Sequence, residues 1–225
     1  MLKIGHRGAK GHKAENTLIG FQKAIDLHVN HIELDVHLSA DDELMVIHDE
    51  TIDRTTNGLG FVRQFSLPEL KRFSIEKEHH IPTLSEVLEL IDQKCAINIE
   101  LKSFETADKV VTLIEKYVHE KKWKYNQFLV SSFNWNALKE VALLNPAIPI
   151  GVITDTDLEL ALAFAKFIQA KSIHPYFHLL TKDNTAQLQQ EGFQVFPWTV
   201  NEIEDIKKIK TYNVDGIISD YPDRL

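Results

Sequence analysis

The residues best suited to chemistry lie between positions 31 and 49. From Ile32 to His37 apolar and polar residues alternate strictly, and the polar ones are Glu33, Asp35 and His37. Successive side chains of a β-strand point to opposite faces, so two carboxylates and an imidazole share one face. Carboxylates two positions apart on a strand lie roughly 6 to 7 Å from each other, given a rise of about 3.3 Å per residue. A cation between them would relieve their repulsion, and hard oxygen ligands select Mg²⁺ or Ca²⁺.

An antiparallel strand with one face in water shows the same alternation, so this stretch alone does not decide between a metal site and a solvated strand. The polar residues 40–43 predict a turn, and the apolar residues 44–47 predict a returning strand. A hairpin that is symmetric about this turn pairs Ser39 with Leu44, His37 with Val46, and Asp35 with His48. This pairing predicts that His48 shares the face of the carboxylates.

A second strand is expected over residues 96–102, with a similar polar face. Asn98, Glu100 and Lys102 alternate there with apolar residues. Both strands lie in a chain that alternates strands with helices, and the strands of such chains are usually covered outside. Two matching polar faces in this setting favour a site over two solvated strands.

The order of the predicted elements indicates the fold class. Helical patterns occur at about 104–121, 134–144, 156–167, 182–191 and 201–211, and two earlier helices follow Glu15-Asn16-Thr17 and the capping box from Thr83 to Glu86. Apart from the returning strand of the hairpin, strands are expected near residues 2, 31, 96, 126, 147, 168, 193 and 214. This alternation predicts an α/β fold of the closed (β/α)8, or TIM-barrel, class, with a hairpin and a short insertion loop over about residues 36–81.

Active sites of such barrels lie at the C-terminal ends of the strands. Residues able to do chemistry cluster at or just beyond those predicted ends: His6, Asp35, Glu100, Ser131, Ser132, His174, Trp198, Ser219 and Asp220. Several have structural explanations as well. Ser131 suits a helix cap, His174-Pro175 a turn, Trp198 packing on the rim, and Asp220 the end of the chain.

Length and composition limit the classes of protein that the chain can represent. Its 225 residues fit one domain, 1–225, and 44% hydrophobic residues are typical of a globular protein with a sizeable core. A net charge of -8 argues against nucleic-acid binding and against attraction to anionic membranes. Cys95 is the only cysteine, and neither a signal peptide nor a transmembrane segment is expected. These features predict a cytoplasmic protein without disulfides.

Short motifs follow one another along nearly the whole chain. They are His6-Arg7-Gly8, Glu15-Asn16-Thr17, Glu33-Leu34-Asp35-Val36, His48-Asp49, Arg54-Thr55-Thr56-Asn57-Gly58, Asn98-Ile99-Glu100-Leu101-Lys102, Ser131-Ser132-Phe133, Trp198-Thr199-Val200 and Asp215-Gly216-Ile217-Ile218-Ser219-Asp220-Tyr221-Pro222. Each motif is weak alone, but the ordered set resembles the glycerophosphodiester phosphodiesterase (glycerophosphoryl diester phosphodiesterase) family. Ala14, where the family commonly has proline, and Ser219, where threonine is frequent, are mild departures.

The resemblance implies a TIM barrel that hydrolyses small-molecule glycerophosphodiesters to glycerol 3-phosphate and an alcohol. It implies that one divalent cation, Mg²⁺ or Ca²⁺, is bound by Glu33, Asp35 and Glu100. It further implies that His6 and His48 are the general acid and base, and that Arg7 and Lys102 hold the phosphate. Glu15, Asn16 and Trp198 are additional candidate site residues. In the mechanism of the family, the glycerol hydroxyl of the substrate attacks phosphorus and water then opens a cyclic phosphate. A cation that lowers the pKa of a bound hydroxyl fits either this path or direct attack by water.

This chemistry suits the residues. A phosphodiester is an anion that repels nucleophiles, so its charge must be neutralised and the attacking oxygen positioned. Imidazole, with an ordinary pKa near 6.5, serves as acid or base near neutrality and predicts a bell-shaped pH profile.

Two other functions were weighed. A barrel hydrolase acting on amides usually holds zinc with paired histidines, and no His-x-His spacing follows His6. A non-catalytic barrel would have lost part of the catalytic set, which is complete here. Residues around Phe133, Tyr176, Phe177 and Trp198 leave a lysophospholipid or another phosphodiester as an alternative substrate.

Overall fold

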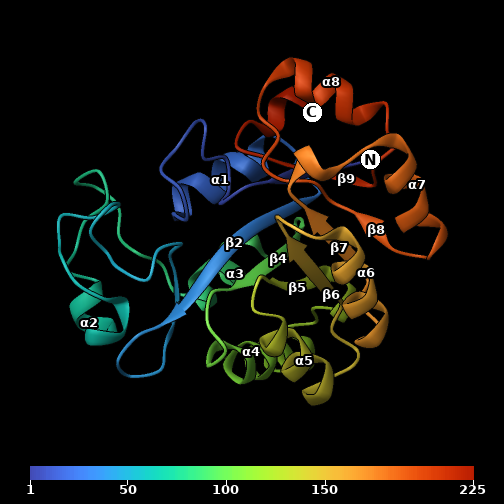
Figure 1. Cartoon of the computed structure of the whole chain (residues 1–225). Helices are drawn as coiled ribbons and strands as arrows, with labels where there is room; N and C mark the ends of the chain where they lie inside the picture. Colours follow the sequence, from blue (N-terminus) through green and yellow to red (C-terminus); the bar gives the residue numbers. More distant parts are fainter.

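Parallel strands form a barrel at the centre of the computed structural model, which describes all residues 1–225 (Figure 1). Their order around the barrel is β8-β7-β6-β5-β4-β2-β1-β9, and a ninth strand, β3 (Leu44–Val46), pairs antiparallel with β2. The parallel strands are β1 (Leu2–Gly5), β2 (His31–Leu38), β4 (Ala96–Leu101), β5 (Phe128–Ser132), β6 (Ile150–Thr154), β7 (Ser172–Pro175), β8 (Gln194–Val195) and β9 (Gly216–Ser219). The predicted (β/α)8 class is confirmed.

Backbone hydrogen bonds join the two ends of this sheet. Asp215 N donates to Val195 O at 3.2 Å, Ile218 N donates to Pro197 O at 3.0 Å, and Val200 N donates to Ile218 O at 3.0 Å. The segment that follows β8 therefore closes the barrel against β9. Closure places the C-terminal residues beside β1, which pairs with β9 from Leu2 to Gly5.

Helices surround the barrel (Figure 1). They are α1 (Leu18–Asp26), α3 (Leu84–Ile91), α4 (Thr106–Glu120), α5 (Trp135–Leu144), α6 (Leu158–Phe167), α7 (Lys182–Gln190) and α8 (Ile203–Lys210), with the 3₁₀ turns η2 (Tyr125–Gln127), η3 (Phe177–Leu179) and η4 (Pro222–Arg224). The predicted capping box of Thr83 and Glu86 is present at the start of α3, and Thr17 Oγ1 caps α1 by accepting from Gly20 N at 3.1 Å. None of the helices is long and apolar enough to cross a membrane.

Several strands after β4 begin later than the sequence patterns predict. The clearest case is β7, which starts at Ser172 rather than near residue 168. Residues 168–171 instead complete the end of α6, because Ile168 N donates to Phe164 O and Gln169 takes the left-handed conformation with a φ of 56°. Apolar residues of this turn resemble the start of a strand in sequence.

Alternation along the strands divides their side chains between two layers. On β2, Ile32, Leu34 and Val36 are fully buried in the core between barrel and helices. Glu33 and Asp35 point into the barrel, as the sequence pattern predicts. The lower part of the barrel interior is filled by the apolar residues Ile4, Leu129, Phe196 and Ile218. The carboxylates of Glu33, Asp35 and Glu100 gather at one point of this interior.

The hairpin between β2 and β3 has a different register from the predicted one. Its pairs are Val36 with Val46, His37 with Met45, and Leu38 with Leu44. The loop therefore holds five residues, 39–43, rather than four, because Ser39 closes it. Ser39 N donates to Glu43 O at 3.0 Å, and Ser39 Oγ accepts from Glu43 N at 2.9 Å. The predicted pairing of Asp35 with His48 is wrong, since β3 ends at Val46 and His48 lies in the following turn.

The excursion after β3 is more structured than a polar loop. It contains η1 (Val62–Gln64) and α2 (Leu67–Leu70), and Figure 1 shows it to one side of the barrel. A small core of its own holds it together, formed by Met45, Ile47, Ile52, Val62, Leu70, Ile75 and Ile81. These apolar residues are scattered among polar ones, which hides them from a periodicity analysis.

Candidate active site

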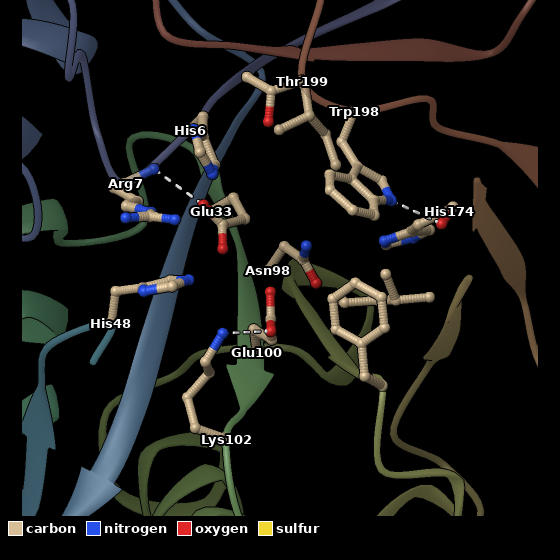
Figure 2. A pocket seen from close by; sticks show the side chains of 13 residues that line it. His6, Arg7, Glu33, His48, Asn98, Glu100, Lys102, His174, Trp198 and Thr199 are labelled. Carbon is tan, nitrogen blue, oxygen red and sulfur yellow. Dashed lines mark hydrogen bonds and ion pairs between the residues drawn. The ribbon is translucent and has the colours of Figure 1, made fainter. Parts of the chain in front are cut away.

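A cavity opens at the C-terminal ends of the strands (Figure 2). It is lined by 13 residues: His6, Arg7, Glu33, His48, Asn98, Glu100, Lys102, Phe133, Ile153, His174, Trp198, Thr199 and Ile218. Both histidines, the phosphate-binding candidates and Trp198 thus meet in one place, as the sequence predicts. Asp35, Glu15 and Asn16 contact lining residues from behind.

The His6-Arg7-Gly8 turn aims two side chains into the cavity directly after β1. Arg7 and Gly8 have φ values of 51° and 88°, in the left-handed region. A Cβ at Gly8 would lie 2.8 Å from the backbone carbon of Gly20, so only glycine fits this turn. The Arg7 backbone N donates to Glu33 Oε2 at 2.8 Å, which ties the turn to β2.

Three carboxylates form an acidic cluster at the ends of β2 and β4. Asp35 and Glu100 are register partners, and oxygens of Glu33, Asp35 and Glu100 lie within 4.8 Å of one another. Burial and the charge of Asp35 raise the pKa of Glu33 well above its ordinary value and that of Glu100 to about 7. Burial would raise the pKa of Asp35 too, but nearby Lys102 and Arg7 lower it.

This donor set fits a hard divalent cation. All three groups are carboxylates, they converge on one point, and burial together with their mutual repulsion raises the proton affinity of Glu33 and Glu100. A cation that replaces those protons would remove the repulsion. Mg²⁺ and Ca²⁺ both accept such oxygen ligands.

Cationic and amide groups surround the acidic cluster. Lys102 Nζ lies 2.7 Å from Glu100 Oε1 and 3.4 Å from Asp35 Oδ1, and Arg7 Nε lies 3.5 Å from Asp35 Oδ2. Burial would lower the pKa of Lys102, but Asp35 and Glu100 raise it, so the ammonium stays charged. Asn16 Nδ2 donates to Asp35 Oδ2 at 2.8 Å and orients this carboxylate.

A carboxylate holds His6 from behind. His6 Nδ1 and Asp220 Oδ1 are 2.5 Å apart, and Asp220 Oδ2 accepts from Asn201 Nδ2 at 2.9 Å. Burial lowers the pKa of His6, although Asp220 opposes the shift. Burial would raise the pKa of Asp220, but His6 lowers it below its ordinary value. An ionised carboxylate can only accept, so Nδ1 of His6 carries the proton and Nε2 is left for the cavity.

His48 is held in the same way by the residue that follows it. His48 Nδ1 and Asp49 Oδ1 are 2.6 Å apart. The guanidinium of Arg54 donates to both oxygens of Asp49, from Nε at 2.7 Å and from Nη2 at 3.0 Å, and this keeps the pKa of Asp49 far below its ordinary value. His37 supports the same turn, since its Nε2 lies 3.1 Å from the carbonyl oxygen of His48.

Glu15 connects the two sides of the site. It accepts from Arg54 Nη2 at 2.7 Å and Nη1 at 3.0 Å, and from Arg7 Nη1 at 2.8 Å. Burial would raise the pKa of Glu15, but the two guanidinium groups lower it to about 2. Glu15 precedes α1 and binds two arginines.

The side of the cavity away from the arginines is aromatic. Trp198 Nε1 donates to His174 O at 2.8 Å, and the Trp198 and Phe133 rings meet edge to face at 5.4 Å. Trp198 therefore forms a wall of the cavity and not only rim packing. His174 is not in a turn but in β7, because Ile153 and His174 are register partners of β6 and β7. Ser131 is likewise a strand residue, and Asn134 caps α5.

Sequence patterns did not assign roles to Asp49, Arg54, Asp220 or Asn201. The motifs contained a signal for the first of these, since Asp49 directly follows His48. Arg54 and Asp220 lie in motifs too, but Glu15 lies 39 positions from Arg54 and His6 lies 214 positions from Asp220. Only the closed barrel shows which groups they contact.

Comparisons with known proteins identify the family of the chain. The model of the glycerophosphoryl diester phosphodiesterase family matches residues 6–224. Glycerophosphodiester phosphodiesterases from Caldanaerobacter subterraneus subsp. tengcongensis and Bacillus altitudinis are each 38% identical, and each alignment covers 100% of this chain and 96% of the relative. A solved phosphodiesterase from Oleispira antarctica, in complex with the product sn-glycerol-3-phosphate, is 26% identical with a TM-score of 0.89 over 98% of this chain and 93% of that one. The chain therefore belongs to the glycerophosphoryl diester phosphodiesterase family and is a phosphodiester hydrolase.

Proposed function

We propose that the chain hydrolyses glycerophosphodiesters to glycerol 3-phosphate and an alcohol, with a divalent cation, by histidine acid and base catalysis through a cyclic phosphate. One observation carries this proposal. Two histidines, each held at Nδ1 by a carboxylate, face one cavity that also contains an acidic cluster, an arginine and a lysine.

Charge supports a cation at Glu33, Asp35 and Glu100. Arg7 and Lys102 leave one negative charge of these three carboxylates uncompensated. A divalent cation and a phosphodiester of charge -1 together add one positive charge, so the site with both bound is neutral. When bound, the cation would withdraw charge from phosphate oxygens and lower the pKa of a nearby hydroxyl.

Arg7 and Lys102 would hold the phosphate. Arg7 is fixed through Nη1 by Glu15, and its Nη2 makes no hydrogen bond within the chain. A guanidinium positioned in this way donates to a phosphate oxygen without further ordering of its side chain. Lys102 approaches from β4 and neutralises a second non-bridging oxygen.

His6 and His48 would move the protons through Nε2. One removes the proton of the glycerol 2-hydroxyl as this oxygen attacks phosphorus, and the other protonates the departing alcohol oxygen. Water then opens the five-membered cyclic phosphate with the two roles reversed, and the product is glycerol 3-phosphate. The paired carboxylates keep the tautomer that both steps need.

The test is release of glycerol 3-phosphate from glycerophosphocholine and glycerophosphoethanolamine with Mg²⁺, with Ca²⁺ and with excess EDTA. We expect metal-dependent release that is lost in His48→Ala, and a transient cyclic phosphate visible by ³¹P NMR. The exposed His119→Ala serves as the control. Turnover of a generic aryl phosphodiester without turnover of either glycerol ester would contradict the proposed substrate class. Activity that persists in EDTA would contradict the proposed role of the cation.

A further inference from the structure

The cavity has two ends of different character. Arg7, His48 and Lys102 lie on one side, and Figure 2 shows Asn98, Trp198 and His174 on the other. We call the second side the deep end and define it by Asn98, Ile153, His174, Trp198 and Ile218. Asn98 is 1% exposed and His174 is fully buried, whereas the side chain of His48 is 32% exposed.

Polar atoms without partners lie in the deep end. Asn98 Oδ1 and His174 Nδ1 are both buried and form no hydrogen bond. Buried polar atoms are usually hydrogen-bonded to protein, water or a ligand, so these two atoms are available to a molecule that enters the cavity. The two residues approach the same cavity from β4 and β7, which lie on different parts of the barrel wall.

Neighbouring residues hold the ring of His174 in place. Its Nε2 lies 2.8 Å from Ser172 Oγ, and Gly151 makes room for the ring, since a Cβ there would lie 2.5 Å from Nε2. Burial also lowers the pKa of His174 to about 3, so the imidazole is neutral at physiological pH. The deep end therefore offers hydrogen bonds without the positive charge that would attract a phosphate.

These features assign the two arms of the substrate. With the phosphate between Arg7 and Lys102, the arm at the deep end must be small, uncharged and able to form hydrogen bonds. Building on the function proposed above, we infer that the deep end is a polyol subsite, in which Asn98 and His174 bind the terminal hydroxyl of the glycerol arm. The alcohol arm then extends to the open side, past His48.

The inference has a consequence for substrate range. A lysophospholipid carries its acyl chain on the terminal glycerol hydroxyl. In the deep end this chain would meet buried side chains and leave Asn98 and His174 unpaired. The subsite therefore excludes lysophospholipids while it tolerates different head-group alcohols.

The test compares three esters of choline phosphate in the intact, metal-loaded enzyme: glycerophosphocholine, its analogue with a 2-hydroxypropyl group in place of glycerol, and 1-acyl-glycerophosphocholine. The analogue keeps the attacking 2-hydroxyl and lacks only the terminal one. Because a site built to bind a hydroxyl strongly rejects a ligand without it, we expect kcat/KM to fall about 100-fold for the analogue. No turnover is expected for the acyl ester. A difference below about threefold, or turnover of the acyl ester, would overturn the inference.

Substitutions of Asn98 and His174 test whether these residues cause the difference in kcat/KM between the two esters. Asn98→Leu and His174→Gln should each lower kcat/KM for glycerophosphocholine far more than for the 2-hydroxypropyl ester. Thr154→Val removes a buried hydroxyl from the end of β6 outside the cavity lining and serves as the control. Equal losses on both esters would contradict the assignment. Hydrolysis of glycerophosphocholine in the same assay upholds the proposed function whatever the ratio.

A binding measurement keeps the two proposals separate if no ester turns over. Calorimetric titration with sn-glycerol 3-phosphate and with 2-hydroxypropyl phosphate compares the same pair of ligands without chemistry. We expect at least tenfold tighter binding of glycerol 3-phosphate in the wild-type chain, reduced in Asn98→Leu. Equal affinities would overturn the polyol subsite.

Discussion

Asp220 lies within 2.5 Å of His6, although 214 residues separate them in the chain. Barrel closure creates this pair, because β9 ends beside β1 and the next residue after β9 reaches the histidine at the end of β1. A carboxylate placed in this way fixes one tautomer and stabilises the imidazolium during proton transfer.

Asp220→Asn should lower kcat at least about 100-fold with little change in the melting temperature, because an amide can impose the wrong tautomer on His6. Steady-state kinetics across pH 5 to 9 measure both kcat and the limb of the profile that His6 controls. Asp223→Asn is a matched control. It removes the carboxylate 2.6 Å from exposed His12, which lies outside the cavity. Equal effects of the two substitutions would show that Asp220 has only a structural role.

Arg54 is expected to act as a positioning residue for both ends of the phosphate site. It binds Asp49 behind His48 and Glu15 behind Arg7. Arg54→Met should reduce kcat/KM by about 10- to 100-fold, and Arg54→Lys should recover part of the loss, since lysine keeps the charge without the planar fork. Arg63→Met removes an exposed arginine of the same excursion that contacts Asp42, and it should leave kinetics unchanged. Full activity of Arg54→Met would contradict the role.

The sequence predicts those features of the site that depend only on residues near one another in the chain. Strands alternate with a period of two, so the inward direction of Glu33, Asp35 and Glu100 follows from residue types alone. The hairpin register did not follow, because it depends on whether Ser39 closes a loop of four residues or five. A shift of one residue in a register moves each side chain to a new partner.

Sequence patterns do not predict contacts between distant segments, and the reason is physical. The partners of Asp220 and Arg54 are set by barrel closure and by packing of the excursion on its own small core. His174 looked like a turn residue because proline follows it, yet Pro175 ends β7, and its carbonyl oxygen still accepts from Trp198 N at 3.1 Å. These positions depend on the whole fold and carry no local signature.

The Glu100→Gln variant should lose activity but be more stable than the wild type when the metal is removed. Mg²⁺ or Ca²⁺ at 100 times its Kd should stabilise the wild-type chain by about 2.7 kcal/mol, measured as a higher melting temperature than in EDTA. Glu100→Gln should lose most of this increase together with activity. In EDTA at pH 8 it should melt above the wild type, because a carboxyl group with its pKa raised to about 7 is a source of repulsion there. Exposed Glu78→Gln should behave like the wild type. A lower melting temperature of Glu100→Gln in EDTA would contradict the repulsion.

Buried His174 should make stability fall as the pH is lowered. Its pKa is lowered from 6.5 to about 3 by burial, so the unfolded chain binds a proton below pH 6.5 that the folded chain does not bind until about pH 3. This contribution is fully present above pH 6.5, and it is lost by about 1.4 kcal/mol per pH unit as the pH falls toward 3. Urea unfolding of metal-free protein at pH 7, 6, 5 and 4 measures the slope. His174→Gln should show a shallower loss of unfolding free energy than the wild type, with exposed His119→Gln as the control for removing a histidine. Parallel slopes for the wild type and His174→Gln would mean that His174 gains its proton in the folded state, and the neutral deep end would then be wrong.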